Sequence, residues 1–275
     1  MKRILVAIAA LSALAAPAAD GAGDAYSPEK HEWSWEGPFG RFDDDQLQRG
    51  FLVYQRVCAS CHGLELLSFR NLGQPGGPFE FIPDPEHEGE MLSFANPNDN
   101  PVVMAIAAEY MITDGPDDFG DMFERPGIPA DNFPSPYAND RQAAAANGGA
   151  LPPDLSVIVK ARHYGADYIR SLLLGYEYDV PEDVELLPGL NYNPYFPGGM
   201  IAMGPQLFEG MIPYQDGSPE TPEQYAEDVT AFLAWASEPH MEQRKRMGLG
   251  VMIFLTIFAG LLWLAYRQVW ANVKH

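Results

Sequence analysis

The most informative stretch of this sequence is Cys58-Ala59-Ser60-Cys61-His62. Two cysteines separated by two residues and followed by histidine form a C-x-x-C-H pattern, which is typical of covalent haem c attachment. The two sulfurs would form thioether bonds to the porphyrin edge, and the histidine would ligate the iron. Cys58 and Cys61 are the only cysteines in 275 residues, so no other thiol is left for a disulfide or a four-ligand metal site. We therefore predict one covalently bound haem c, with His62 as the first axial ligand.

A thiol–disulfide oxidoreductase is the competing interpretation of a C-x-x-C pair. That class does not require a histidine after the second cysteine. It is also expected to show a βαβ pattern around the motif, which this sequence lacks.

The first 19 residues have the pattern of a secretory signal peptide. Lys2 and Arg3 are followed by an apolar run over residues 4–15 and by small residues at 16–18, a suitable cleavage signal. This leader predicts that residues 20–240 form a domain on the periplasmic side of a bacterial membrane. Export agrees with the haem motif, because bacteria assemble covalent haem c outside the cytoplasm.

Residues 241–275 are predicted to form a C-terminal membrane anchor. Residues 247–266 carry no charge, and 20 helical residues reach ~30 Å, enough to cross a bilayer core. Trp263, Tyr266 and Trp270 lie toward one end, like an interfacial aromatic belt. Three basic residues, 244–246, precede the span, against the positive-inside tendency. The leader nevertheless orients the helix outside to inside, leaving a short cytoplasmic tail.

The chain is strongly acidic, with 38 Asp and Glu against 17 Lys and Arg and a net charge of −21. Several of the basic residues belong to the leader or flank the anchor, so the exported domain is more acidic than the chain as a whole. The negative electrostatic field of such a domain repels nucleic acid and anionic lipid, and it favours rapid encounter with a basic partner. The acidic residues are grouped at 43–45, 84–90, 114–124 and 177–185.

The secondary-structure pattern predicts a mainly α protein with long Pro/Gly-rich loops and few strands. Residues 73–101 are expected to be loop because proline and glycine interrupt them. Helices are predicted from about Asp44 to Cys58, over Pro101–Thr113, over Ser156–Leu174, and from the cap at Thr221 to just before Pro239.

A low-spin electron carrier needs a second axial ligand, usually methionine or histidine. Met200 and Met203 lie in a stiff loop bounded by Pro197 and Pro205, which suits a side chain presented to a flat porphyrin. The residues alone do not choose between these two methionines, and a histidine stays open as well.

Several segments together resemble the cytochrome c1 family, the haem subunit of the cytochrome bc1 complex (ubiquinol–cytochrome c oxidoreductase). The resemblance runs in order from about Trp33 to the C-terminus. Besides the C-x-x-C-H motif, it rests on Asn147–Ser156, Ala161–His163, Asn193–Gly198, Asp216–Pro219 and Arg244–Leu249.

The resemblance implies a cytochrome c-like haem domain with a set of site residues. Its pattern places the axial methionine at Met203, before Gly204-Pro205, which leaves Met200 as a packing residue. It places an arginine near a haem propionate at Arg162, where a surface ion pair would otherwise be the expectation. By analogy with c-type cytochromes, the carbonyl of Pro152 or Pro153 would accept a hydrogen bond from His62. Because no further cysteines are available for a disulfide, we expect packing and prolines to hold the loop from Tyr176 to Phe196.

The function implied is electron transfer in the respiratory cytochrome bc1 complex. The subunit would pass one electron from the Rieske iron–sulfur protein through haem c to a basic or membrane-attached c-type cytochrome. It would assemble with cytochrome b in the bacterial inner membrane as a single-pass protein. It would not be an enzyme on its own, because quinol oxidation would occur on cytochrome b. The alternatives are a membrane-anchored cytochrome c of another respiratory oxidoreductase, or a haem peroxidase or sensor with an open sixth site.

Overall fold

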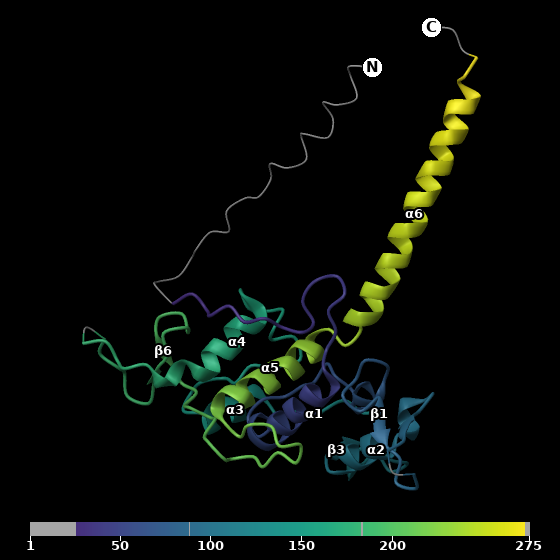
Figure 1. The fold of residues 1–275 in the computed structure, drawn as a ribbon. Coiled ribbons are helices and arrows are strands. Elements are labelled where there is room, and N and C mark those ends of the chain that lie inside the picture. Colours follow the sequence, from purple (N-terminus) through teal and green to yellow (C-terminus); the bar gives the residue numbers. More distant parts are fainter. Residues whose placement is uncertain (1–25, 88, 183, 273–275) are drawn as a thin grey trace.

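The computed structural model describes residues 26–87, 89–182 and 184–272 (Figure 1). The signal peptide predicted at 1–19 lies outside the described residues. The α-helices are α1 (Asp44–Val53), α2 (Pro101–Ala108), α3 (Asp140–Ala146), α4 (Gly165–Leu174), α5 (Pro222–Ser237) and α6 (Met241–Val269). The strands are β1 (Phe81–Pro83), β2 (Met91–Ser93), β3 (Met111–Asp114), β4 (Phe123–Pro126), β5 (Asn191–Tyr192) and β6 (Met200–Ile201). Short helical turns are η1 (Tyr54–Cys58), η2 (Phe69–Gly73), η3 (Pro97–Asp99) and η4 (Gly175–Glu177). The predicted mainly α class with little strand is confirmed.

Helices α1 and α5 form the centre of the core and lie side by side (Figure 1). The Asp43 carboxylate caps α1 by accepting a hydrogen bond from the backbone of Gln46. Leu47 and Phe51 are buried on one face of α1, as their helical spacing predicts. The backbones of the two helices approach closely at Gly50, where an added Cβ would lie 2.0 Å from the Asp228 carbonyl oxygen. Glycine at this position therefore sets the distance between the two helices.

A buried charge network ties α1 to α5. Asp228 is completely buried, and its carboxylate accepts hydrogen bonds from Arg49 at 2.9 Å and from the Tyr214 hydroxyl at 2.9 Å. The Gln224 side chain donates a further hydrogen bond of 2.9 Å. With three donors satisfying it, the carboxylate stays compatible with a dry environment.

The segment before α1 runs across α4. The Trp33 indole N–H and the His31 backbone N–H both donate to the Asp167 carboxylate, at 2.7 and 3.2 Å. Trp33 also stacks on Trp35 with ring centroids 4.7 Å apart. These contacts fix α4, and the loops at its two ends carry candidate site residues.

The strands form three separate two-stranded antiparallel ladders within the described residues. The prediction that 73–101 is loop therefore missed a short hairpin, β1–β2, although most of that segment is irregular. The predicted helix over Pro101–Thr113 was wrong in its second half. α2 ends at Ala108, and Met111–Asp114 pairs instead with Phe123–Pro126. Arg125 stabilises that pairing because its guanidinium bridges Asp114 and Asp131 at 2.6 and 2.7 Å.

The predicted helix over Ser156–Leu174 was also too long. Residues 156–164 form turns, and α4 begins only at Gly165. Tyr164 has a left-handed φ of 66°, which separates the turns from the helix. By contrast, α5 begins as predicted, with the Thr221 hydroxyl accepting a hydrogen bond from the Gln224 backbone.

Helix α6 projects away from the rest of the protein (Figure 1). It is longer than the predicted span, and its most apolar 18-residue window has a mean hydropathy of 2.3. None of that window is buried against the rest of the described chain, which separates it from a core helix. Length, composition and exposure together make α6 a candidate membrane span.

Candidate haem-binding site

Both cysteines and His62 lie on one tight turn that follows α1. The helix continues through the η1 turn, and the backbone N–H groups of Cys61 and His62 both donate to the Cys58 carbonyl, at 3.1 and 2.9 Å. The hydroxyl of buried Tyr54 donates to the His62 carbonyl at 3.0 Å. The turn is therefore closed from within and also attached to the core helix that precedes it.

The His62 ring is oriented by a residue from a distant part of the chain. Its Nδ1 lies 2.7 Å from the Pro153 carbonyl oxygen. A carbonyl can only accept, so Nδ1 carries the hydrogen and the lone pair is left on Nε2. Burial also lowers the pKa of His62 and favours the neutral ring. This is the tautomer and the charge state that a metal ligand requires.

A ladder of hydrogen bonds joins residues 62–66 to residues 153–156. Besides the His62 contact, the Leu155 N–H donates to the Gly63 carbonyl at 2.9 Å. The Glu65 N–H donates to the Asp154 carboxylate at 2.8 Å, and the Leu66 N–H donates to the Ser156 hydroxyl at 3.1 Å. The segments are about 90 residues apart in the sequence, so this ladder brings the two parts of the site together.

Asp154 holds this ladder, and we predict that replacing it destabilises the site. One carboxylate oxygen accepts from Glu65 and the other from the Ser156 N–H at 2.8 Å. Asp154→Ala leaves both N–H groups without these acceptors.

We expect the free energy of unfolding to fall by about 1–2 kcal/mol. Hydrogen bonds to charged groups contribute most to stability, but this site is partly exposed. Thermal unfolding of the haem-loaded chain in detergent, followed at the haem absorption, measures the loss. Asp179→Ala, at an exposed acidic residue, is the control and should change little. Equal unfolding temperatures for the two variants would contradict the role of Asp154.

The environment of Cys58 does not fit a redox-active thiol. Burial raises the pKa of the Cys58 thiol to about 12, and neighbouring Cys61 adds to this effect. Catalytic C-x-x-C cysteines instead have a lowered pKa that maintains the thiolate. The strands of the described chain are all antiparallel, so the parallel βαβ unit of thioredoxin-like proteins does not occur there. Both findings disfavour the thiol–disulfide oxidoreductase interpretation.

Met203 lies just after β6, and its backbone is held from two sides. The Tyr176 hydroxyl donates to the Met203 carbonyl at 2.8 Å, and the Asn191 amide donates to the same oxygen at 3.4 Å. Met200 instead lies within β6 and pairs with Tyr192 across the β5–β6 ladder. The two methionines therefore have different backbone environments, although both side chains are half-buried.

The loop from Tyr176 to Phe196 is held by hydrogen bonds as well as by packing. Completely buried Asn193 donates from its side chain to the Leu172 carbonyl at 2.7 Å. The hydroxyls of Tyr178 and Tyr195 are hydrogen-bonded to each other at 2.9 Å. The expectation of packing and prolines alone missed these polar contacts.

Arg162 lies in the turn before α4 with an exposed side chain. Its guanidinium donates to the Ala161 carbonyl at 3.2 Å, and it forms no ion pair with any carboxylate of the described residues. Its charge opposes the rise in pKa that burial causes in Tyr168 of α4. Arg162 therefore lies within electrostatic reach of the Tyr168 side chain in α4.

The residues present fit the haem that the motif implies. The two thiols are unpaired, the His62 Nε2 faces no competing hydrogen bond in the described chain, and Arg162 is available for a carboxylate. Large apolar side chains also lie exposed on and beside the two ladder segments: Leu66, Leu151 and Val157. Contact with a flat apolar ring would remove this apolar surface from water.

The structure brings together Cys58, Cys61, His62 and Pro153, and it gives Met203 and Arg162 separate supports around α4. All of these residues were predicted from the sequence, whereas the roles of Asp154, Tyr54, Tyr176 and Asn191 were not. Asp154 could have been found, because an Asp whose side chain accepts from the N–H two residues later is a common turn signal. The hydrogen bonds of the other three residues join positions that are not sequence neighbours, and no local sequence pattern predicts them.

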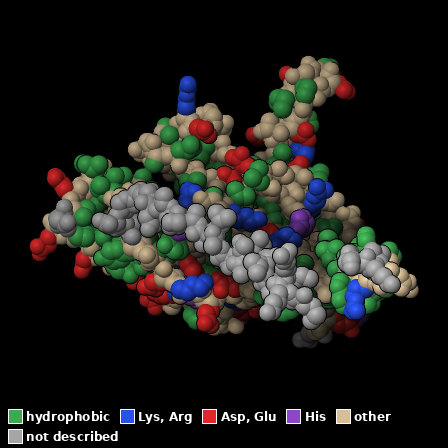
Figure 2. Space-filling model, turned by 90° about the horizontal axis from the view of Figure 1, so that it is seen from above, with side chains coloured by type: hydrophobic (Ala, Val, Ile, Leu, Met, Phe, Trp, Pro, Cys, Tyr) green, Lys and Arg blue, Asp and Glu red, His purple; other side chains and the backbone are tan. Residues whose placement is uncertain are grey.

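The acidic groups predicted from the sequence are spread over the protein surface. Figure 2, viewed from the side from which α6 projects, shows Asp and Glu side chains at several places on that face. One acidic group lies in and after β3: Asp114 is half-buried, and Asp117, Asp118 and Asp121 are exposed. No single acidic patch on the visible face dominates.

Comparison with known proteins gives consistent matches over most of the chain. Residues 33–273 match the model of the Cytochrome C1 family. Cytochrome c1 of Rhodospirillum rubrum is 42% identical over 290 residues, covering 100% of this chain and 98% of that protein. Cytochrome b/c1 of Bradyrhizobium diazoefficiens is 48% identical over 263 residues, covering 89% of this chain but only 36% of that longer protein. The mitochondrial cytochrome c1 haem protein of Saccharomyces cerevisiae is 44% identical over 245 residues, with 89% and 72% covered.

Proposed function

The chain belongs to the cytochrome c1 family, and from this premise we propose that it carries single electrons within a cytochrome bc1 complex. Membership makes it a haem-containing c1 subunit of that complex, and the described residues include one candidate membrane span. We propose in addition that the subunit accepts an electron from the Rieske iron–sulfur protein and delivers it to a c-type cytochrome. The haem domain would face the periplasm, and residues 241–275 would anchor it.

Each site residue has a specific part in this proposal. When bound, haem c supplies a one-electron iron couple. Cys58 and Cys61 would hold the macrocycle through thioether bonds, and His62 and Met203 would supply the two axial ligands. A histidine and methionine pair raises the potential of the iron, as acceptance from a high-potential donor requires. Arg162 would neutralise a propionate, for which its planar guanidinium is well suited.

The observation that carries the proposal most strongly is the hydrogen bond from His62 to Pro153. This hydrogen bond fixes the orientation of an uncharged imidazole and leaves its Nε2 free. The imidazole lies on the same turn as both cysteines. An exposed surface histidine would have no need of a fixed tautomer. The carbonyl comes from Pro153 in the segment Asn147–Ser156, which is among those that carry the family resemblance.

We propose cytochrome b and the Rieske protein as the partners in the membrane. The Bradyrhizobium relative is named cytochrome b/c1, and this chain covers only part of its length. The acidic surface supports a basic or membrane-attached c-type cytochrome as the electron acceptor, because opposite charge accelerates encounter. This subunit would make or break no covalent bond in the reaction, so it would not be an enzyme alone.

Purification of the full chain in mild detergent from its own membranes tests this function. We expect a cytochrome b and an iron–sulfur subunit to co-purify, and added quinol to reduce the c haem through them. A haem that stays oxidised with quinol and binds carbon monoxide after chemical reduction would contradict the proposal and favour a peroxidase or sensor. The absence of a covalent haem stain on a denaturing gel would contradict it as well.

A further inference from the structure

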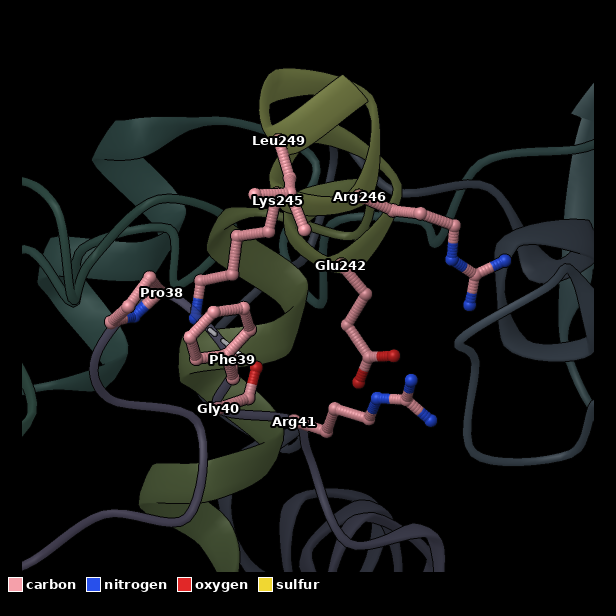
Figure 3. Close-up of a pocket in the computed structure, with 8 residues that line it drawn as sticks. All are labelled: Pro38, Phe39, Gly40, Arg41, Glu242, Lys245, Arg246 and Leu249. Atoms are coloured by element: carbon pink, nitrogen blue, oxygen red, sulfur yellow. Dashed lines mark hydrogen bonds between the residues drawn. The ribbon is translucent and has the colours of Figure 1, made fainter. Parts of the chain in front are cut away.

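A groove outside the haem site lies where α6 leaves the globular part of the protein (Figure 3). It has a volume of about 160 Å³. One wall is the N-terminal segment before α1, and the other is the first three turns of α6. The lining residues are Pro38, Phe39, Gly40, Arg41, Glu242, Lys245, Arg246 and Leu249.

The groove is locally cationic within a strongly acidic protein. Arg41, Lys245 and Arg246 line it, and none of them forms an ion pair with a carboxylate of the described residues. The neighbouring Arg244 differs, because it is paired with Glu238 at 2.5 Å. The one acidic residue of the lining, Glu242, accepts a hydrogen bond from the Phe42 backbone at 3.0 Å. The lining itself thus carries three cations against one carboxylate, in a chain of net charge −21, and the Asp44 carboxyl lies within electrostatic reach of Glu242.

The cationic wall is built in advance of any ligand. Lys245 donates hydrogen bonds to the carbonyls of Trp35 and Gly40, at 2.6 and 3.2 Å. These bonds join α6 to the N-terminal segment and keep the ammonium group inside the groove. Figure 3 shows the Glu242 carboxylate pointing toward Arg41, while the side chains of Lys245 and Arg246 extend to opposite sides of α6.

The remaining lining is apolar and reaches the candidate membrane span. Phe39 is 76% exposed and Leu249 is 49% exposed. Leu249 lies within the uncharged run that begins at residue 247, whereas Lys245 and Arg246 come just before it. The groove thus changes from cationic to apolar at the level where a bilayer surface would meet α6. The change from a cationic to an apolar surface along the groove matches a phospholipid, whose phosphate lies at the interface above its acyl chains.

We propose that this groove binds the headgroup of an anionic phospholipid, with an acyl chain lying along α6 at Leu249. Arginine side chains form paired hydrogen bonds with phosphate oxygens, and Lys245 adds a fixed point charge. The acidic field of the domain repels anionic lipid elsewhere on its surface. The lipid would therefore bind at this groove and would help to set the height of the haem domain above the membrane.

Lipid retention by the detergent-purified complex tests the proposal. The complex is stripped of lipid and supplied with phosphatidylglycerol, and bound lipid is counted by native mass spectrometry. Arg246→Gln and Arg41→Gln remove groove charges, and Arg244→Gln is the control because it removes a neighbouring charge that is already paired. We expect each groove variant to weaken retention about fivefold, since a basic residue near an anionic lipid surface contributes on that scale. The control should retain phosphatidylglycerol like the wild type, and phosphatidylcholine should bind more weakly than phosphatidylglycerol.

Several results would overturn this assignment. Equal losses in Arg244→Gln and Arg246→Gln would show a general charge effect, and displacement by inorganic phosphate would show a site for soluble anions. Loss of a partner polypeptide with unchanged lipid content would show that protein occupies the groove. Arg246 is exposed and has no described partner, so Arg246→Gln keeps the test available if Arg41→Gln fails to assemble. Haem absorption and quinol-driven reduction report on the haem site separately, so failure here leaves the proposed function standing.

Discussion

Met203→Lys is expected to leave the haem covalently attached and to lower its midpoint potential by a few hundred millivolts. The cysteines and His62 lie on a different segment, so the attachment should survive. A thioether favours the reduced iron, whereas an amine is a harder ligand that favours the oxidised iron. Axial ligands set haem potentials over a range of about 0.8 V, so an exchange of this kind moves the potential by a large part of that range. Redox titration of the purified complex measures it.

The matched control is Met200→Lys, three residues earlier in the same segment. Met200 pairs with Tyr192 in the β5–β6 ladder, whereas Tyr176 and Asn191 hold the backbone of Met203. We expect the potential of the Met200 variant to stay close to that of the wild type. A large fall in the Met200 variant with an unchanged Met203 variant would reverse the assignment. An unchanged potential in both would move the ligand to a histidine or leave the sixth position open.

Gly50→Ala is expected to give the largest loss of stability among conservative substitutions in the core. The new Cβ would lie 2.0 Å from the Asp228 carbonyl oxygen and 2.8 Å from the Phe232 Cβ. Because one of these neighbours is backbone, α1 and α5 must separate. Overpacking costs about 1–3 kcal/mol or more, and the gain of about 1 kcal/mol in helix propensity offsets only part of it. A net loss of about 2 kcal/mol would lower the unfolding temperature by roughly 4–8 °C in a domain of this size.

Calorimetry of the haem-loaded chain in detergent can measure this loss. Asp45→Ala is the control, because it places alanine on the exposed face of the same helix. We expect that variant to stay within about 0.5 kcal/mol of the wild type. A Gly50 variant as stable as the Asp45 variant would mean that the two backbones are not in close contact.

The sequence predicted those parts of the fold that depend on local patterns. The α1 helix leading into Cys58, the Thr221 cap of α5 and the apolar run of α6 all have signals within a few residues. The second half of the predicted 101–113 helix was wrong because Met111–Asp114 pairs with β4, which begins 12 residues after β3 begins, and this pairing outweighs helix propensity there. The start of α4 was misplaced because the left-handed Tyr164 interrupts a segment whose apolar spacing continues through it.

The residues of the candidate site also divide into those with a local sequence signal and those without one. The C-x-x-C-H motif identified three residues by itself, and the family resemblance added Met203, Arg162 and the proline pair. The structure then selects Pro153 over Pro152 as the partner of His62. Tyr176 and Asn191 lie 27 and 12 residues from the carbonyl they hold. Contacts of this kind follow from how loops pack around α4, and no periodicity in the sequence records them.

The methionine-to-iron charge-transfer band of the oxidised protein distinguishes His62 and Met203 ligation of a haem held by Cys58 and Cys61 from every alternative ligand set. We expect the wild type and the Met200→Lys variant to show the band, and the Met203→Lys variant to lack it while keeping a covalent haem. An intact band in the Met203→Lys variant, or no band in the wild type, would contradict this ligation.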